Sequence, residues 1–276
     1  METSSVGLMA KLSEEAIALA RQALSLLQSK KVKVYVEENT ARLMGVEGVP
    51  LSEMRVDVLV TVGGDGTILR AAQQVDPPET PLLGINLGGL GFLSEASPEQ
   101  LSEVIERLVR GSFTVEYRSK LAVFHQEERL PDALNELLVI TARPSKVIEV
   151  EVQKDGYPFY KGKMDGVIVS TTTGSTAYAL SAGGVIVDPK VDIIELVFIC
   201  PISPCVRPII LPPTTVLEVK IGEGGAPAMA SIDGQFLEEL SEGSAIMVRR
   251  SEHKAAFVKL RPDFYSKLKS KMHIQL

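Results

Sequence analysis

The sequence has little of what would stabilise a disulfide-rich domain or form a zinc site. It contains 2 cysteines and 3 histidines in 276 residues. Two cysteines in a chain of this length do not form a disulfide framework. Neither Cys200 nor Cys205 has a histidine near it in the sequence. We therefore expect two free thiols in a reducing compartment and no zinc site.

Long apolar runs are also missing. No apolar stretch reaches the about 18 residues that a membrane-spanning helix requires. The longest candidate, Ile193–Ile199, is interrupted by Glu195 and predicts a buried strand. Met1–Leu12 has no cationic start followed by a long apolar run, which argues against a secretory signal. We expect a cytoplasmic protein that does not bind membranes.

An excess of positive charge is absent as well. The chain has 29 Lys and Arg against 35 Asp and Glu, a formal net charge of -6. Proteins that bind nucleic acid or anionic membranes usually display a basic surface, so we expect neither partner. Apolar residues make up 45% of the chain, which is enough for one large core or two moderate ones.

The first part of the chain alternates predicted helices and strands. Ser13 offers an N-cap to a helix that ends near Gln28. Ser97–Gln100 has the residues of a capping box and predicts a second helix start. Strands are predicted at 32–36, 56–62 and 82–86. Such alternation indicates βαβ units and a mainly parallel sheet.

The pattern changes after Gly111, where runs become short and rich in strand-forming residues. Asp-Gly pairs at 155–156 and 233–234 are typical of hairpin turns, and one helix is predicted over Thr176–Ala182. We therefore predict an α/β N-terminal domain with a mainly parallel sheet over residues 1–114 and a mostly β C-terminal domain over 115–260. The tail, 261–276, could pack back on the first domain, which the sequence alone does not decide.

The most informative segment is a predicted buried strand that runs into Gly63-Gly64-Asp65-Gly66-Thr67, where a helix begins. Glycine lets a ligand approach the backbone closely, and free N–H groups at a helix N-terminus favour phosphate. We predict that Gly63, Gly64, Gly66 and Thr67 form a phosphate loop. The alternative is a tight strand-to-helix turn with an aspartate cap, but three glycines around one acid exceed what such a turn requires.

Asp65 indicates the kind of chemistry. A carboxylate beside a triphosphate is repelled unless it binds a metal ion or meets an acceptor hydroxyl, and either role points to phosphoryl transfer. The loop is not a Walker A motif, because no Gly-Lys-Ser/Thr follows. A second glycine loop, Gly84–Phe92, also follows a strand. Ligands of open α/β sheets bind at the carboxyl ends of strands, so two such loops strengthen the prediction.

Two polar segments of the second half are candidate ligand contacts. Six of the seven residues 170–176 carry hydroxyls, and Tyr178 could offer a ring face to a flat ligand. The alternative is a Ser/Thr loop that caps a helix, with Tyr178 in the core. Asn135 and Glu136 interrupt an apolar strand and suit the hydroxyls of a ribose, unless they are a strand end that meets solvent. Neighbouring strand residues point to opposite faces, so we expect at most one of them to face the core.

Together these motifs resemble the NAD kinase family over about residues 56–258. The resemblance is carried by Gly-Gly-Asp-Gly-Thr at 63–67, Asn135-Glu136, Asp165-Gly166, Thr-Gly-Ser-Thr-Ala-Tyr at 173–178 and Asp233-Gly234-Gln235. The first motif is shared with diacylglycerol kinases, sphingosine kinases and phosphofructokinases. The others, in this order, single out the NAD kinases.

The resemblance implies transfer of the terminal phosphoryl group of ATP, another triphosphate or polyphosphate to the adenosine 2′-hydroxyl of NAD. It also implies a divalent metal ion, with Mg²⁺ expected, and a homodimer or homotetramer in which a neighbouring subunit supplies part of the nucleotide contacts. By position, it implies Asp65 as the catalytic residue. The implied NAD contacts are Asp65, Gly66, Arg70, Asn135, Glu136, Lys146, Lys163, Asp165, Thr176, Ala177, Tyr178, Ala179, Leu180, Ser181 and Gln235.

The chain departs from the family pattern at two positions. The family usually has proline where this chain has Thr172 and commonly histidine where it has Ile202, whereas Arg207-Pro208 keeps the expected pair. These departures concern loop geometry and subunit contacts rather than the implied chemistry.

Two other functions compete with this one. A lipid kinase of the diacylglycerol or sphingosine type shares the glycine loop but needs an apolar acceptor site and attraction to a membrane. The acidic composition and the lack of a basic amphipathic segment argue against it. A catalytically silent dinucleotide-binding sensor would have no use for Asp65.

Overall fold

The computed structural model describes residues 3–88, 91–261 and 264–272. The chain forms two compact units: unit 1, residues 1–117 and 255–276, and unit 2, residues 118–254. The predicted boundary lies three residues before this one. Residues 255–260 were assigned to the β domain but belong to unit 1, because the end of β17 (Ala245–Lys259) pairs in parallel with β5 (Leu82–Asn86) at Phe257 and Leu82.

Unit 1 is built on a parallel sheet with the strand order β5-β4-β1-β2-β3. Every neighbouring pair in this order is parallel. The apolar runs of the sequence become strands because both faces of the sheet are covered, as parallel sheets require. The further strands of this order are β1 (Ser5–Ala10), β2 (Lys33–Glu37), β3 (Gly48–Val49) and β4 (Val58–Gly63).

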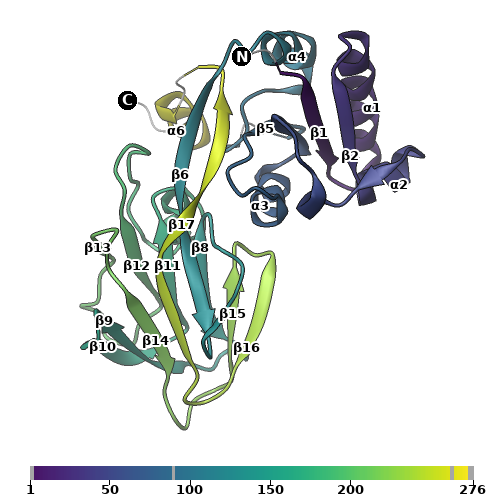
Figure 1. Ribbon diagram of the computed structural model, residues 1–276. Coiled ribbons are helices and arrows are strands. Elements are labelled where there is room, and N and C mark those ends of the chain that lie inside the picture. The colour runs from purple at the N-terminus through teal and green to yellow at the C-terminus, as the bar shows by residue number, and fades with distance from the viewer. Residues whose placement is uncertain (1–2, 89–90, 262–263, 273–276) are drawn as a thin grey trace. The chain divides into compact units, whose positions relative to one another are not determined.

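Helices cover the two faces of this sheet. Helices α1 (Glu14–Ser29) and α4 (Leu101–Val109) form one core with strand residues such as Leu8, Val60 and Ile85. Helix α3 (Asp65–Gln74) contacts β4 and β5, and its Ile68 packs where Gly84 leaves space on the opposite face. Figure 1 shows α1 alongside β1 and β2, with the short α2 (Glu38–Met44) beyond them.

Both predicted helix starts are confirmed. The Ser13 hydroxyl accepts a hydrogen bond from the Ala16 N–H at 3.4 Å and caps α1. The side chain of Gln100 accepts from the Ser97 N–H at 3.1 Å, in a short 3₁₀ turn over Pro98–Gln100 that leads into α4. A second 3₁₀ turn, Leu51–Glu53, precedes β4.

Unit 2 is a sandwich of antiparallel strands. One sheet has the order β13-β12-β11-β8-β15-β16, and strands β10, β9, β14 and part of β17 face it across a shared core. Residues such as Leu137, Val150 and Ile246 from both layers make up this core. The strands are β6 (Thr114–His125), β7 (Glu128–Arg129), β8 (Glu136–Thr141), β9 (Ile148–Lys154), β10 (Tyr157–Met164), β11 (Gly166–Thr171), β12 (Ile194–Ile199), β13 (Ile209–Leu211), β14 (Leu217–Ile221), β15 (Ala228–Ile232) and β16 (Phe236–Leu240).

The predicted helix over Thr176–Ala182 is wrong in extent. The chain forms a 3₁₀ turn over Gly174–Thr176 and then a single helical turn, α5 (Tyr178–Ser181). Ala177 separates the two with φ of -103° and ψ of -131°, which is not helical, so a continuous helix cannot form. The buried strand predicted around Glu195 is confirmed as β12.

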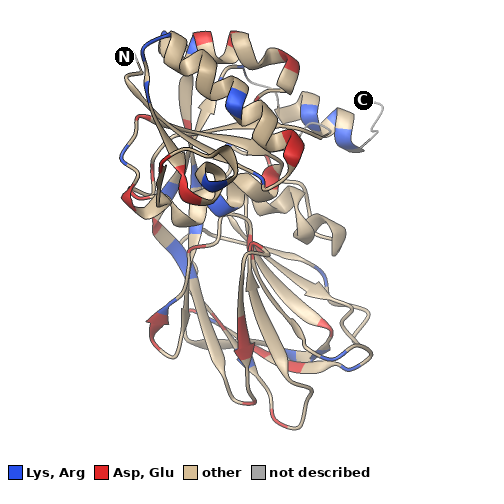
Figure 2. Ribbon diagram, turned by 90° about the vertical axis from the view of Figure 1, so that its right-hand side faces the viewer, with Lys and Arg blue, Asp and Glu red and all other residues tan. Residues whose placement is uncertain are grey.

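Acidic and basic residues are interspersed along the described ribbon of each unit (Figure 2). Cys200 and Cys205 are both free and exposed. None of the described helices combines the length and apolar character needed to cross a membrane.

Candidate functional site

The predicted phosphate loop joins β4 to α3 in unit 1. Strand β4 ends at Gly63 and α3 begins at Asp65. A Cβ at Gly63 would overlap the Thr67 hydroxyl, so the chain turns tightly there only with glycine. At Gly66 an added Cβ would meet no described atom within 4 Å, and the residue is exposed. The loop is therefore closed on its Thr67 side and open at Gly66, where a ligand can approach the backbone.

The second glycine loop holds the side chain of Asp65. The Phe92 N–H donates to Asp65 Oδ2 at 2.9 Å. A Cβ at Gly91 would overlap Asp65 Oδ1, so glycine makes room for the carboxylate. Asp65 Oδ1 is shielded from solvent and has no hydrogen-bond partner among the described residues. One oxygen is thus fixed by backbone, while the other keeps its capacity to accept a hydrogen bond or bind a cation.

The two glycine loops are neighbours, as their position after parallel strands predicted. Strands β4 and β5 pair in parallel, and the Leu87 N–H donates to Gly63 O at 3.1 Å. Gly89 and Leu90 of the second loop lie outside the described residues. The sequence suggested only that this loop shared the sheet edge. Its contact with Asp65 depends on a backbone N–H, which no residue type reveals.

Arg70 adds a positive charge to the same helix. It is half-buried on α3, and its Nη2 has no hydrogen-bond partner within the described part of the chain. A shielded guanidinium nitrogen without a partner is costly to keep. The combination of a free carboxylate oxygen and a free guanidinium nitrogen favours a ligand that carries both acceptor and donor groups.

In unit 2, Asp233 shapes the Asn135–Glu136 pair. Asp233 and Gly234 form the turn between β15 and β16 with φ of +52° and +65°. Asp233 Oδ1 accepts from the N–H groups of Asn135 at 2.8 Å and Glu136 at 3.0 Å, and Oδ2 accepts from Leu134 at 2.8 Å. Three consecutive N–H groups on one carboxylate fix the backbone of this corner. The sequence predicted the Asp-Gly hairpin but gave no signal of this contact, which spans 99 residues.

The expectation that at most one of Asn135 and Glu136 faces the core is not contradicted, because Leu137 and Val139 of β8 point into the sandwich core and Glu136 shares the opposite face with Leu138. Both are buried, with 9% and 8% exposed. Strand β8 begins only at Glu136, so Asn135 lies before the region in which side chains alternate. The alternative of a solvent-facing strand end is excluded by the same burial.

Burial, and to a smaller extent the nearby charge of Asp233, raises the pKa of Glu136 to about 8. The side chain is therefore largely protonated at neutral pH and can donate as well as accept a hydrogen bond. Its Oε2 has no hydrogen-bond partner among the described residues. Burial also raises the pKa of Asp233, against the three N–H donors that stabilise its charged form.

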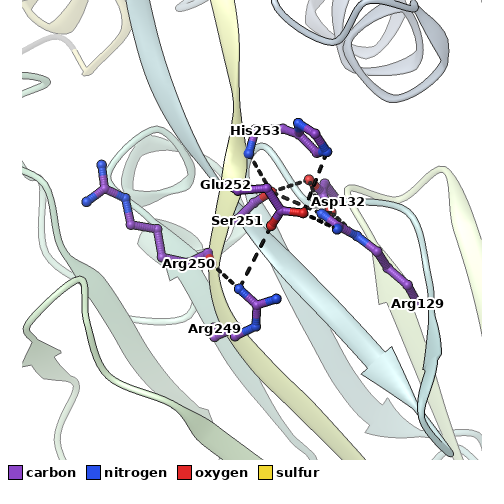
Figure 3. A network of polar contacts seen from close by, with 7 residues as sticks. All are labelled: Arg129, Asp132, Arg249, Arg250, Ser251, Glu252 and His253. Carbon is purple, nitrogen blue, oxygen red and sulfur yellow. Dashed lines mark hydrogen bonds and ion pairs between the residues drawn. The ribbon is translucent and has the colours of Figure 1, made fainter.

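A buried lysine and a polar network lie behind Asp233. Burial lowers the pKa of Lys120, whereas the negative charges of Asp132 and Asp233 act to raise it. Figure 3 shows Asp132 held by Arg129, at 2.8 Å, and by the hydroxyl of Ser251. His253 donates its backbone N–H, not its ring, to that hydroxyl at 3.0 Å, so the group is no hydrolytic triad. The network fixes Asp132 and, through the charge of Lys120, supports Asp233.

The hydroxyl-rich segment packs against the same corner. The Thr171 N–H donates to Asn135 O at 2.8 Å, and its hydroxyl donates to Leu134 O at 2.6 Å. Ser175 and Thr176 donate their hydroxyls to carbonyls within their own turn. These hydroxyls serve structure, as the Ser/Thr-loop alternative predicted. Tyr178 is not in the core as that alternative required, because its side chain is 41% exposed.

Thr172, which stands where the family usually has proline, ties two loops together. Its hydroxyl donates to Val191 O at 2.5 Å and accepts from the Ile193 N–H at 3.3 Å. A proline would make neither bond, so this departure changes how the segment before β12 is held. Ile202, at the second departure, is exposed.

The implied NAD contacts of unit 2 lie at two opposite ends of one sheet. Strands β8 and β11 pair with Glu136 opposite Ser170 at one end and Ile140 opposite Gly166 at the other. The Asp233 turn, the start of β8 and the segment after β11 lie at the Glu136 end of this sheet. The residues at this end are Asn135, Glu136, Thr176, Ala177, Tyr178, Ala179, Leu180, Ser181 and Gln235.

The Gly166 end carries the remaining three. Asp165 connects β10 to β11 and is half-buried, its N–H donating to Ile199 O at 3.0 Å. Lys163 on β10 and Lys146 in the turn before β9 are exposed. Within one chain, these three residues do not join the Asn135–Glu136 corner. Ala179 packs its side chain against Ile168 and Val197 and is fully buried in the chain.

Unit 1 has a glycine loop that opens on a carboxylate oxygen without a partner among the described residues. Unit 2 has a buried amide–carboxyl pair suited to sugar hydroxyls. These two features are typical of a phosphotransferase with a hydroxyl acceptor. Comparison with known proteins narrows this class. Residues 6–113 match the ATP-NAD kinase N-terminal domain, and residues 134–260 match the ATP-NAD kinase C-terminal domain. The chain belongs to the NAD kinase family, and its activity is that of an NAD kinase, the transfer of a phosphoryl group to NAD.

Individual relatives agree with this assignment. The chain is 40% identical to an NAD kinase of Methanothermobacter thermautotrophicus over 97% of this chain and 95% of that protein. It is 38% identical to one of Thermococcus kodakarensis, covering 94% of each. A crystal structure of an NAD kinase from Archaeoglobus fulgidus in complex with ATP superposes with a TM-score of 0.81 at 29% identity, over 96% of this chain and 99% of that one.

Yeast NADH kinase complexed with NADH superposes with a TM-score of 0.91 at 25% identity, over 100% of this chain and 89% of that one. The predicted family and fold class are thereby confirmed. The lipid-kinase alternative gains no support from any of these comparisons.

Proposed function

We propose that Asp65 is the catalytic residue of this NAD kinase and acts on the adenosine 2′-hydroxyl of NAD. The observation that carries this proposal is the state of its carboxylate: Oδ2 is fixed by the Phe92 N–H, and Oδ1 has no partner among the described residues. A carboxylate is a weak base for a sugar hydroxyl. If the transition state is loose, orientation of the hydroxyl matters as much as removal of its proton. A rigidly held carboxylate suits this task.

The donor phosphates would lie on the loop of Gly63, Gly64, Gly66 and Thr67. The N-terminus of α3 presents N–H groups and the positive end of a helix dipole, which favours phosphate. The unpartnered guanidinium nitrogen of Arg70 is a further donor on this helix. ATP is the expected donor, with another triphosphate or polyphosphate as alternatives. The ATP complex of the Archaeoglobus relative supports ATP.

A divalent metal ion, Mg²⁺ by expectation, fits this site as a companion of the triphosphate. Among the described residues, no group of three His, Cys, Asp or Glu side chains could hold a metal ion alone. Mg²⁺ commonly takes one or two carboxylates together with substrate phosphates and water, and Asp65 Oδ1 is such a carboxylate oxygen. When bound, the ion neutralises charge on the transferring phosphoryl group.

NAD would be held by the Asn135–Glu136 corner. The Asn135 amide and the protonated Glu136 carboxyl offer both donors and acceptors to the hydroxyl pair of a ribose. The exposed ring of Tyr178 is free to stack on a flat base. Thr176–Ser181 and Gln235, at the same sheet end, would surround the nucleotide. The NADH complex of the yeast relative supports a nicotinamide dinucleotide as ligand.

The enzyme would act as a homodimer or homotetramer in the cytoplasm. Lys146, Lys163 and Asp165 lie at the sheet end away from the Asn135–Glu136 corner, which favours their contribution to the site of a neighbouring subunit. Two free exposed cysteines suit a reducing compartment.

The proposal is tested by incubating purified protein with ATP, Mg²⁺ and NAD and assaying NADP. Diacylglycerol in a parallel reaction tests the lipid-kinase alternative, and NADH tests the preference for the oxidised acceptor. We expect NADP, with the phosphate on the adenosine 2′-oxygen, and no phosphorylated lipid. Binding of NAD without any product would favour the silent sensor and contradict the proposal.

A further inference from the structure

The C-terminal helix carries a buried lysine next to the loop that holds Asp65. Lys267 lies on α6 (Phe264–Met272) and is 1% exposed. Its Nζ donates to Ser94 O at 2.6 Å and lies 3.9 Å from Glu95 Oε2. Burial of an ammonium group costs several kcal/mol unless it is paired and hydrogen-bonded. A polar helix that buries a lysine and directs it at Ser94 O indicates a specific role for this contact.

The turn that Lys267 contacts is connected to Asp65. The Ser94 hydroxyl accepts from the Gly91 N–H at 3.0 Å and from Asn86 Nδ2 at 3.3 Å. Phe92 follows Gly91 in the sequence, and its N–H donates the hydrogen bond that fixes Asp65 Oδ2. Gly91 itself lies against Asp65 Oδ1. A movement of Ser94 would therefore shift both backbone positions that define where the carboxylate sits.

Glu95 secures the chain that leads to α6. The residue is buried, and its Oε1 accepts from the N–H groups of Leu260 at 2.7 Å and Arg261 at 3.2 Å. Its Oε2 pairs with Lys259 Nζ at 2.8 Å. The Glu95 N–H donates to Gly84 O at 2.8 Å, which attaches the segment to β5. Glu95 thus binds the chain that leads to α6 and also adjoins the turn of residues 91–94 that holds Asp65.

Phe92 makes a second contact with α6. Its ring centroid lies 6.4 Å from that of Phe264, and Lys271 Nζ lies 4.6 Å above the ring. Aromatic and cation–π contacts of this kind are attractive and favour a fixed position of the ring. The residue whose N–H holds Asp65 is therefore held by the tail through its side chain as well.

We propose that α6 is a positioning element for the catalytic aspartate, with Lys267 as the positioning residue. Lys267 fixes the turn of residues 91–94 through Ser94 O, and this turn fixes the carboxylate of Asp65. The inference rests on the proposed catalytic role of Asp65.

A role in stability alone would have a different signature. A lysine that only stabilises unit 1 would lower the free energy of unfolding when replaced but leave kcat of the folded enzyme unchanged. A positioning residue lowers kcat with little change in KM, because small displacements of a reacting group weaken the transition state more than the ground state.

The test compares Lys267→Met with Lys267→Arg in the full-length enzyme, with Lys269→Met as the control on an exposed lysine of the same helix. We expect Lys267→Met to lower kcat about tenfold, with KM for ATP and NAD within about twofold. Lys267→Arg keeps a charged donor and should restore most of kcat, and Lys269→Met should match the wild type. Equal kcat in folded Lys267→Met and wild type, or equal losses in both Met variants, overturns the proposal.

Ser94→Ala provides a second variant that leaves α6 intact and serves if Lys267→Met does not fold. It removes the acceptor of the Gly91 N–H, so kcat should again fall about tenfold, and the double variant should lose less than the product of the two losses. An unchanged kcat in Ser94→Ala contradicts the proposal, because the route from Lys267 to Asp65 runs through this residue.

Amide hydrogen exchange separates failure of this inference from failure of the proposed function. Lys267→Met should accelerate exchange at Gly91 and Phe92, and this readout requires no activity. Unchanged exchange there overturns the positioning role even if the wild type makes NADP. Accelerated exchange in a protein that makes no NADP would support the coupling of α6 to the turn and reject the catalytic role of Asp65.

Discussion

Two aspartates, one in each unit, are held by backbone N–H groups in very different ways. Asp233 accepts from three N–H groups with both oxygens and is buried, at 5% exposure. Asp65 accepts from one N–H with one oxygen, is half-buried, and keeps the other oxygen without a partner among the described residues. Both carboxylate oxygens of Asp233 therefore accept backbone hydrogen bonds, whereas one oxygen of Asp65 can still accept a hydrogen bond from a ligand.

The difference follows from where each aspartate stands. Asp233 occupies a left-handed turn between antiparallel strands, with the N–H groups of a neighbouring strand start close to it. Asp65 begins a helix after a parallel strand, between glycines that leave one side open. An anion with several N–H donors is a stable anchor, whereas an anion with one donor can still take a ligand. On the proposed function, the aspartate of unit 1 is the reacting group, whereas the aspartate of unit 2 holds the backbone around Asn135 and Glu136.

The largest effect is expected from Asp65→Asn. The amide keeps the size of the side chain and still accepts from the Phe92 N–H, but it binds a cation weakly and cannot take a proton. Turnover should fall about 10³-fold, within the range for loss of a general base, while folding and NAD affinity persist. Steady-state kinetics and thermal unfolding check this, and near-normal turnover would refute the role of Asp65.

Gly91→Ala tests the position of Asp65 without removing it. The new Cβ would overlap Asp65 Oδ1 and push the carboxylate aside. We expect kcat to fall about 10- to 100-fold, since a displacement of about 1 Å can cost that much. Gly88→Ala is the control, because its Cβ would lie 3.9 Å from Asn86 Oδ1, an ordinary contact. Equal kcat in the two variants would mean that the exact place of the carboxylate is unimportant.

Asp233→Asn should act on acceptor binding. The amide replaces one accepting oxygen by a donor, which leaves at least one of the three N–H groups without its partner. We expect the free energy of unfolding to fall by about 1–3 kcal/mol and the NAD dissociation constant to rise about tenfold as the corner loosens. Urea unfolding and calorimetric titration with NAD measure the two quantities.

The matched control for Asp233→Asn is Asp155→Asn, in the other Asp-Gly hairpin. Asp155 has φ of +53° but is exposed, and it accepts one backbone N–H, from Val216 at 2.9 Å. NAD affinity should be unchanged in this variant. A similar loss of affinity in both variants would mean that the hairpin geometry, not the three-fold N–H contact, sets the acceptor site.

The last prediction concerns the pH dependence of stability rather than turnover or NAD affinity. The pKa of Glu136 is raised from 4.5 to about 8 in the folded state. From pH 4.5 to 8 the unfolded chain loses this proton while the folded chain keeps it, so the stabilisation present below pH 4.5 is lost, by at most about 1.4 kcal/mol per pH unit. Glu136→Gln does not titrate and should gain stability relative to wild type as pH rises. Parallel pH profiles in urea unfolding would contradict this.

Most of the fold, and the glycine loop around Asp65, could be predicted from local sequence patterns. Alternating apolar runs, the Ser13 cap and the glycines around Asp65 each reflect a rule that acts within a few residues. The sequence left open whether Asn135 and Glu136 are buried or meet solvent, because their surroundings include the distant Asp233. The separation of Lys146, Lys163 and Asp165 from the Asn135–Glu136 corner depends on strand register. The roles of Asp233 and Lys267 depend on contacts across 99 and 173 residues, which a single sequence does not report.

The most direct test of the division between the two units is to measure kcat and the NAD dissociation constant on Asp65→Asn and Asp233→Asn in the same preparation. The account predicts a crossed result. Asp65→Asn loses turnover and keeps NAD affinity, whereas Asp233→Asn loses affinity and keeps most of its turnover at saturating NAD. If both variants lose turnover and NAD affinity in parallel, Asp65 and Asp233 do not have separate roles in reaction and acceptor binding, and the account is wrong.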